Sequence, residues 1–306
     1  MKASSPIAMA VVAVAAACTA LAGTPVQALR QVHEEREADP GAVIEVANVS
    51  GRLTIKGWDR KALEVTGTLG DEVERLEISG NAQRLEVRVI LPKRSIRGDC
   101  DADLELHLPR AADLELSTVS ADITVSDFAG ELQAESVSGD VGVAGQMKGI
   151  EIEVVSGEVT LAGQAPKVHI EAISSDVHLE HLAPEPRTEL AVETVSGDII
   201  VSGTLAGCEL ESVSGDLLFD GDLVADGVYD LTSHSGDVHL LLQADADARF
   251  DLSTFSGELT GTLVTEMTER RHSRSAPGEE LDFTLGAGRA RVRVETFSGD
   301  VEIERR

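Results

Sequence analysis

The feature that most constrains the fold is a six-residue pattern that returns along the chain at a nearly fixed spacing. SVSGDV begins at Ser136, and close copies begin at Thr194, Ser212 and Thr296. A period of about 20 residues is typical of solenoids, in which each repeat forms one coil that stacks on its neighbours. Taking the second serine of each copy as its reference position aligns nine copies, at Ser120, Ser138, Ser156, Ser174, Ser196, Ser214, Ser235, Ser256 and Ser298.

The spacing between these reference serines is 18, 18, 18, 22, 18, 21, 21 and finally 42 residues. Since 42 is twice 21, the sequence predicts that one copy has been lost near residues 274–278. The remaining coils are then expected to stack in the order in which they occur along the chain.

Each repeat has the pattern of a strand, a tight turn and a second strand. In GIEIEVVSGEVTLAG, Ile150 and Ile152 alternate with acids before the turn, and Val159 and Leu161 alternate after it. Alternation with a period of two buries one face of a strand, and Ser-Gly-Asp provides turn residues. The predicted fold class is all-β: a single-stranded, β-helix-like β-solenoid of about nine regular coils, roughly 43 Å long, with an N-terminal β cap.

Residues 1–28 have the pattern of a cleaved signal peptide, because Lys2 precedes an apolar run and small residues flank the expected cleavage site. The sequence therefore predicts export, to the periplasm or as a secreted protein. Cys18 offers the alternative of a lipoprotein, although Ala15 stands where such a signal usually has Leu or Val. No transmembrane span is expected in the mature chain.

The rest of the chain divides by composition into three parts. Residues 29–40 form a polar leader, and residues 41–110 are predicted to be β-rich, forming the first coils and the cap. Residues 111–306 hold the regular repeats, which a basic loop at about 265–280 interrupts.

The charge balance excludes some classes of partner. Removal of residues 1–28 takes away one basic residue, so the mature chain keeps 54 acidic and 25 basic residues. Nucleic acids and anionic lipids need clustered Lys and Arg, so neither is an expected partner. A cationic peptide or a divalent cation is compatible with this charge. Cys100 and Cys208 are expected several coils apart, and thus as free thiols.

The order of the motifs resembles that of a known family. IEVANVSGRLTIKGWD, LELHLPRAADLELSTVSADITV and the serial Ser-Gly-Asp repeats are similar to the bacterial putative-adhesin family of β-strand-repeat proteins, a domain of unknown function. The resemblance covers roughly residues 42–302 and implies an exported or envelope-associated β-solenoid. The family's name suggests adhesion, some relatives are associated with envelope stress, and no catalytic residues carry over. The basic stretch at 265–280 departs from the pattern.

The first candidate site is a column of acids two residues after each reference serine, which we call the acidic ladder. In-register coils would place these carboxylates about 5 Å apart, where like charges repel by about 1 kcal/mol in water. The ladder could collect divalent cations or a cationic peptide. The favoured alternative is that each Asp hydrogen-bonds within its own turn, since one carboxylate per coil supplies few ligands for calcium. The ladder consists of Asp122, Asp140, Glu158, Asp176, Asp198, Asp216, Asp237, Glu258 and Asp300.

The second candidate is the basic loop, which could dock a partner or simply be a solvated insertion, the favoured alternative. Its basic residues are Arg270, Arg271, His272 and Arg274. No metal or cofactor site is predicted, because no zinc-type spacing occurs and His178 and His239 are expected about 14 Å apart. No Gly-x-Ser-x-Gly elbow or other catalytic set stands out.

The sequence therefore predicts a non-catalytic, adhesin-like binding or scaffold surface in the cell envelope, with an envelope, glycan or protein ligand. Two alternatives stay open. One is an envelope-stress component that binds cationic peptides, and the other is a β-helix enzyme acting on polysaccharide.

Overall fold

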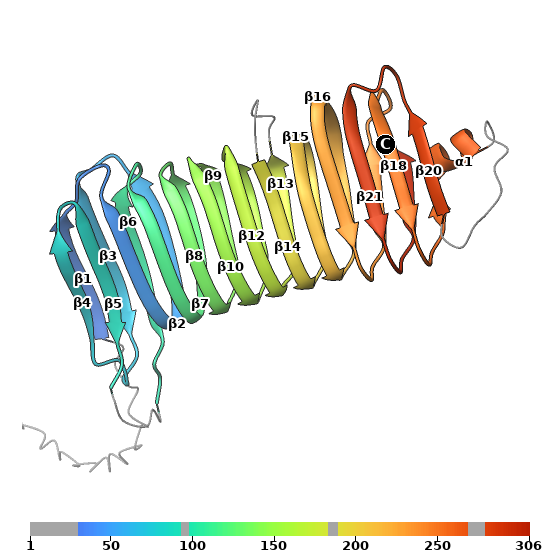
Figure 1. Ribbon diagram of the computed structural model, residues 1–306. Coiled ribbons are helices and arrows are strands. Elements are labelled where there is room, and N and C mark those ends of the chain that lie inside the picture. The colour runs from blue at the N-terminus through green and yellow to red at the C-terminus, as the bar shows by residue number, and fades with distance from the viewer. Residues whose placement is uncertain (1–29, 93–97, 183–188, 269–278) are drawn as a thin grey trace, which may run out of the picture.

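The protein is an elongated stack of β-strands, as the computed structural model shows for residues 30–92, 98–182, 189–268 and 279–306 (Figure 1). These residues form 22 strands in one continuous hydrogen-bonded sheet and one helix of seven residues. The predicted all-β class is confirmed. No helix in the described ranges is long and apolar enough to span a bilayer. The predicted signal peptide lies outside them.

Each repeat contributes a strand before its Ser-Gly-Asp turn, the leading strand, and one after it, the trailing strand. Leading strands are β8 (Glu131–Ser138), β10 (Gly149–Ser156), β12 (Lys167–Ser174) and β14 (Glu189–Ser196). Trailing strands are β9 (Val141–Gln146), β11 (Val159–Gln164), β13 (Val177–Leu182) and β17 (Val238–Leu242). Longer strands join two such segments: β2 (Val43–Trp58), β7 (Asp113–Phe128), β15 (Ile199–Ser214) and β16 (Leu217–Ser233).

Successive coils pair in parallel and in register. Glu135 lies opposite Glu153, which lies opposite Glu171 in the following leading strand. The trailing strands pair in the same way, so a position in one repeat lies beside the same position in the next. This register turns each repeated residue into a row that runs the length of the stack.

The core fills the space between the leading and the trailing strands. Leu132 and Ala134 of β8 face inward, as do Val141 and Val143 of β9, and each is at most 2% exposed. Small aliphatic side chains suffice here, because every coil supplies the same inward positions and the rows pack on each other continuously. A chain with only 3% aromatic residues can therefore keep one uninterrupted core.

The N-terminal end widens the stack with two strands parallel to β2 and three strands that pair antiparallel to these or to each other. The described strands here are β1 (Arg30–Glu37), β3 (Ala62–Leu69), β4 (Arg75–Asn81), β5 (Arg84–Ile90) and β6 (Ala102–Pro109). β2 pairs with β7 on one side and with β5 and β6 on the other, while β4 extends β5, and β3 and β1 extend β6. Part of the predicted polar leader is thus β1, an edge strand whose charged side chains disfavour pairing with another chain.

At the C-terminal end the coils do not follow the order of the sequence. The elements are β18 (Ala248–Thr254), β19 (Leu259–Thr260), α1 (Thr262–Thr268), β20 (Glu279–Thr284), β21 (Ala290–Thr296) and β22 (Val301–Arg305). β21 pairs with β16 on one side and β18 on the other, and β22 lies between β17 and β19. Figure 1 shows the red β21 standing between the orange β16 and β18.

The expectation that the coils stack in the order of the sequence is therefore wrong, and residues 274–278, where a copy is predicted to be lost, lie outside the described residues. The chain first forms the outer coil with β18 and β19, passes through α1 and β20, and returns to insert its last coil inside. Insertion buries that coil on both sides, so that Val292, Val294, Val301 and Ile303 are all 0% exposed. A terminal coil in sequence order would have left one of its strand edges open.

Candidate functional site

The acidic ladder lies at the corner where each coil turns, and its aspartates bond to the neighbouring coil. Asp216 Oδ1 accepts a hydrogen bond of 2.8 Å from the backbone N–H of Asp237. The bonds run between coils and not within one turn, because in-register stacking places the next backbone N–H beside each carboxylate. All seven aspartates accept such a bond, namely Asp122, Asp140, Asp176, Asp198, Asp216, Asp237 and Asp300.

These bonds explain why the stack tolerates a column of like charges. Each aspartate gains a charge-assisted hydrogen bond, which compensates for the repulsion between neighbouring carboxylates. Within the described part of the chain, no three His, Cys, Asp or Glu side chains are grouped so as to hold a metal ion. Binding of a cation or a cationic peptide by the ladder stays a prediction.

Replacing Asp216 with alanine should lower the free energy of unfolding by about 1 kcal/mol, because the N–H of Asp237 loses its acceptor. Asp216→Asn keeps an acceptor and removes one charge from the column, so it should cost little or nothing. Urea denaturation of both variants checks this. Equal destabilisation by Ala and Asn would show that the charge, and not the hydrogen bond, matters at this position.

The outward face of the leading strands presents two parallel rows that the sequence interpretation missed. The first, the glutamate row, consists of Glu135, Glu153, Glu171, Glu193 and Glu211, each in register with the next. The second, the apolar row, lies two residues further along each strand, and its members are between 42% and 61% exposed. The apolar row consists of Val119, Val137, Val155, Ile173, Val195, Val213, Phe297 and Phe255.

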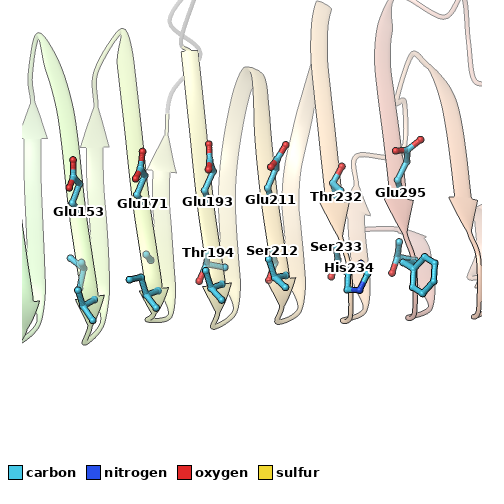
Figure 2. Close-up of a pocket in the computed structure, with 18 of the residues that line it drawn as sticks. Glu153, Glu171, Glu193, Thr194, Glu211, Ser212, Thr232, Ser233, His234 and Glu295 are labelled. Carbon is cyan, nitrogen blue, oxygen red and sulfur yellow. The ribbon is translucent and has the colours of Figure 1, made fainter.

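The two rows border one long groove of about 1830 Å³ (Figure 2). Figure 2 shows Glu153, Glu171, Glu193 and Glu211 aligned on successive strands. Eight glutamates line the groove, and its described lining contains one histidine and no Lys or Arg. The groove is larger than most small-molecule sites and is elongated across many coils, which suits a polymeric ligand.

The C-terminal part of the apolar row is aromatic. His234 takes the place between Val213 and Phe297, and its ring stacks on that of Phe297 at 5.0 Å. Phe297 stacks in turn on Phe255 at 4.8 Å. The inserted coil therefore completes the row, because Phe297 comes from the last repeat of the chain but lies between His234 and Phe255.

Most of the glutamate row lacks a basic partner. Glu171 Oε1 lies 2.9 Å from His169 Nε2, whereas Glu135, Glu153, Glu193 and Glu211 pair with no basic side chain among the described residues. Burial raises the pKa of the Glu211 carboxyl, and the charges of neighbouring acids, including Glu193, raise it further. Four members of the glutamate row therefore carry negative charge without a basic partner, whereas Glu295 at the C-terminal end of the groove pairs with Arg293.

The inward side of the leading strands contains two buried hydroxyls without hydrogen-bond partners among the described residues. In several coils the hydroxyl at this position donates to a backbone carbonyl or to a neighbouring hydroxyl, as Ser136 does to Ser138 and Thr254 to Gly299. Thr194 and Ser212 are only 4% and 5% exposed, and their hydroxyl oxygens have no such partner. Both are in register with Val154 and Ala172 of the core, on the opposite side of the strand from the glutamate row, so they do not face the groove.

Replacing Glu211 with glutamine should stabilise the protein at pH 7. The fold holds the pKa of this carboxyl above its ordinary value of 4.5. The folded protein therefore binds this proton more tightly than the unfolded chain does. The resulting stabilisation is fully present below about pH 4.5 and is lost as the pH rises through the raised pKa of the folded state. Because the side chain is exposed, we expect a gain of about 0.5 kcal/mol at neutral pH and no difference near pH 4. Thermal unfolding between pH 4 and pH 7 measures this gain. A variant less stable than the parent protein at pH 7 would show that the fold does not destabilise the Glu211 carboxylate.

The remaining predicted positions contribute no site in the described residues. Arg270, Arg271, His272 and Arg274 of the basic loop lie outside them. Cys100 and Cys208 are not bonded to each other, and burial raises the pKa of the Cys208 thiol.

The two histidines considered for metal binding are separated along one row. His178 pairs with Ile200, which is followed in the row by Leu218 and then His239. His239 Nδ1 instead lies 2.9 Å from Glu302 Oε2.

A repeated pattern in the sequence indicates the apolar row. Val, Ile or Phe precedes the reference serine in eight of the nine repeats, at a position that the alternation directs outward. Such a side chain would ordinarily face inward, and its repeated placement on the outer face distinguishes it from scattered surface residues.

The family described as Toastrack DUF4097 matches residues 44–304. Among solved structures, a putative adhesin from Parabacteroides merdae ATCC 43184 is 10% identical, with a TM-score of 0.45 over 90% of this chain and 96% of that one. A putative adhesin from Bacteroides fragilis NCTC 9343 is 11% identical, with a TM-score of 0.39 over 90% and 97%. A putative lipid binding protein from Parabacteroides distasonis ATCC 8503 is 12% identical, with a TM-score of 0.25 over 90% and 96%. No curated protein matches the chain. These structural likenesses are too distant to support a functional assignment.

Proposed function

Because the chain belongs to the Toastrack DUF4097 family, whose match spans residues 44–304, we propose that it is a non-catalytic, adhesin-like binding protein of the cell envelope. In this proposal the stack is a β-solenoid of about nine regular coils, with residues 41–110 as its N-terminal cap. The solenoid presents its grooved face to a partner.

The observation that supports this proposal most strongly is the apolar row. Its eight members are between 42% and 61% exposed, although Val, Ile and Phe are ordinarily buried. With His234 they occupy nine successive coils, so the row extends over about 38 Å at the spacing of parallel strands. Contiguous exposed apolar surface of this extent marks an interaction site, whereas single exposed apolar residues do not.

The composition of the groove favours binding over catalysis. Its outward side chains repeat from coil to coil, so that the segments from Glu135 to Val213 each offer a carboxylate and an aliphatic side chain. Many equivalent contacts suit an elongated partner held by the sum of weak interactions. An enzyme acting on polysaccharide would instead need dissimilar acid, base and positioning groups gathered at one point.

We place the protein outside the cytoplasm, exported by a signal peptide at residues 1–28, with lipidation through Cys18 as the alternative route to the envelope. The excess of acidic over basic residues, 54 against 26 in the full chain, is consistent with a partner other than nucleic acid.

The proposal is tested by binding of purified residues 29–306 to immobilised bacterial envelope fragments. Replacing Val155, Val195 and Val213 together with serine should reduce binding at least about tenfold, since each buried valine contributes on the order of 1.5 kcal/mol. Val228→Ser is the control, because Val228 is 54% exposed but lies outside the groove. Undiminished binding by the triple variant would exclude the apolar row as the binding surface.

A further inference from the structure

We infer that the groove binds an amphipathic α-helix that carries a basic stripe beside an apolar stripe. This inference rests on the proposed function and adds the chemistry of the partner. The two stripes correspond to the glutamate row and the apolar row, which run side by side along the stack.

The charges of the groove select a cationic partner. Eight glutamates line it, and its described lining has no Lys or Arg. Glu193 and Glu211 lie side by side in adjacent coils without a basic partner among the described residues, and burial together with this repulsion raises the pKa of Glu211. Lys or Arg side chains from a ligand would relieve the repulsion and would gain charge-assisted hydrogen bonds.

The spacing of the rows favours a helix over an extended peptide. Parallel coils repeat at about 4.8 Å, and an α-helix lying along the groove repeats its faces about every 5.4 Å. Over the five glutamates, about 19 Å, this difference adds up to only about 2.4 Å. An extended strand places side chains of one face about 6.8 Å apart, so it would lose register after one or two coils.

Two other occupants are disfavoured by charge. A second copy of this chain would bring a net charge of -28 and the same glutamate row into the groove. A membrane surface of anionic lipid would be repelled for the same reason. Sedimentation of the protein alone and with anionic vesicles, run beside the following measurement, detects both.

The probe is an 18-residue synthetic peptide of Leu and Lys, arranged so that a helix segregates them into two stripes, with a fluorophore for anisotropy. It is titrated with residues 29–306 at low and moderate salt. We expect saturable binding that weakens at least tenfold for Glu193→Gln with Glu211→Gln, and also for Val195→Ser with Val213→Ser. Added salt should weaken binding as well.

Matched controls separate groove binding from general attraction by an acidic protein. Glu37→Gln with Glu304→Gln makes the same change of charge outside the groove and should leave the affinity unchanged. A peptide of the same composition in an order that mixes the stripes should bind at least tenfold more weakly, and a Leu and Glu peptide should not bind. The Glu193→Gln, Glu211→Gln variant should unfold no earlier than the parent protein, so weaker binding cannot be ascribed to unfolding.

The inference is overturned if the mixed peptide binds as well as the segregated one, or if the outside control weakens binding as much as the groove variant. It is also overturned if the protein self-associates through the groove or binds anionic vesicles in preference to the peptide. If no peptide binds while the triple valine variant still loses binding to envelope fragments, the proposed function stands and the helical partner is wrong. If both measurements fail, both proposals fall.

Discussion

Replacing Gly157 with alanine is expected to lower the free energy of unfolding by at least about 2 kcal/mol, because the side chain would strain the turn. Gly157 has a φ of 128°, a conformation that side chains rarely adopt. An added Cβ would lie 2.3 Å from the carbonyl oxygen of Gly139 in the preceding coil. Backbone cannot move away there without disturbing the stacking of the turns. Urea denaturation measures the loss.

Gly142→Ala is the matched control, in a trailing strand of the neighbouring coil. The nearest atom to its added Cβ is the carbonyl oxygen of Ile123 at 3.8 Å, an ordinary contact. Alanine should be neutral or stabilise by up to about 0.5 kcal/mol, since it restricts the unfolded chain. Equal effects of the two substitutions would mean that the turn glycines are not needed for close approach of the coils.

Removing residues 288–306 should destabilise the protein more than deleting the longer segment 248–289. The short truncation removes β21 and β22 from between two coils, and with them Val292, Val294, Val301 and Ile303, all fully buried. These four side chains alone contribute on the order of 6 kcal/mol, comparable to the whole stability of a domain. The longer deletion removes only the outer coil and the segment that follows it. It brings Ser298 to a 21-residue step from Ser235, a spacing already present between Ser214 and Ser235.

Thermal unfolding and limited proteolysis of the two variants measure this difference. The order of the coils is checked directly by cysteine pairs in a background that lacks Cys100 and Cys208. Thr232 and Glu295 are paired neighbours, so cysteines there should form a disulfide, whereas cysteines at Thr232 and Ser253 are two coils apart and should not. A disulfide in the second pair only would restore the serial order.

Much of the fold follows from local patterns. The alternation around Ile150 and Val159 predicts which side chains are buried, and the return of Ser-Gly-Asp predicts where each coil turns. Both depend on neighbours in the sequence, since a strand exposes every second residue and glycine permits a tight turn. The groove could not be predicted from local patterns, because a row such as Glu193 and Glu211 exists only after the coils have stacked in register.

The sequence by itself determined that the chain is all-β, that its core is aliphatic and that its surface is strongly acidic, because composition and a period of two express these properties directly. Only the tertiary structure decided the position of the last coil. β16 and β18 offer equivalent edges for pairing with β21, and the place between them buries Val292 and Val294 from both sides. The tertiary structure also decided which carboxylates are available. Stacking satisfies the aspartates of the acidic ladder with backbone N–H groups, and leaves Glu193 and Glu211 in the groove without a basic partner among the described residues.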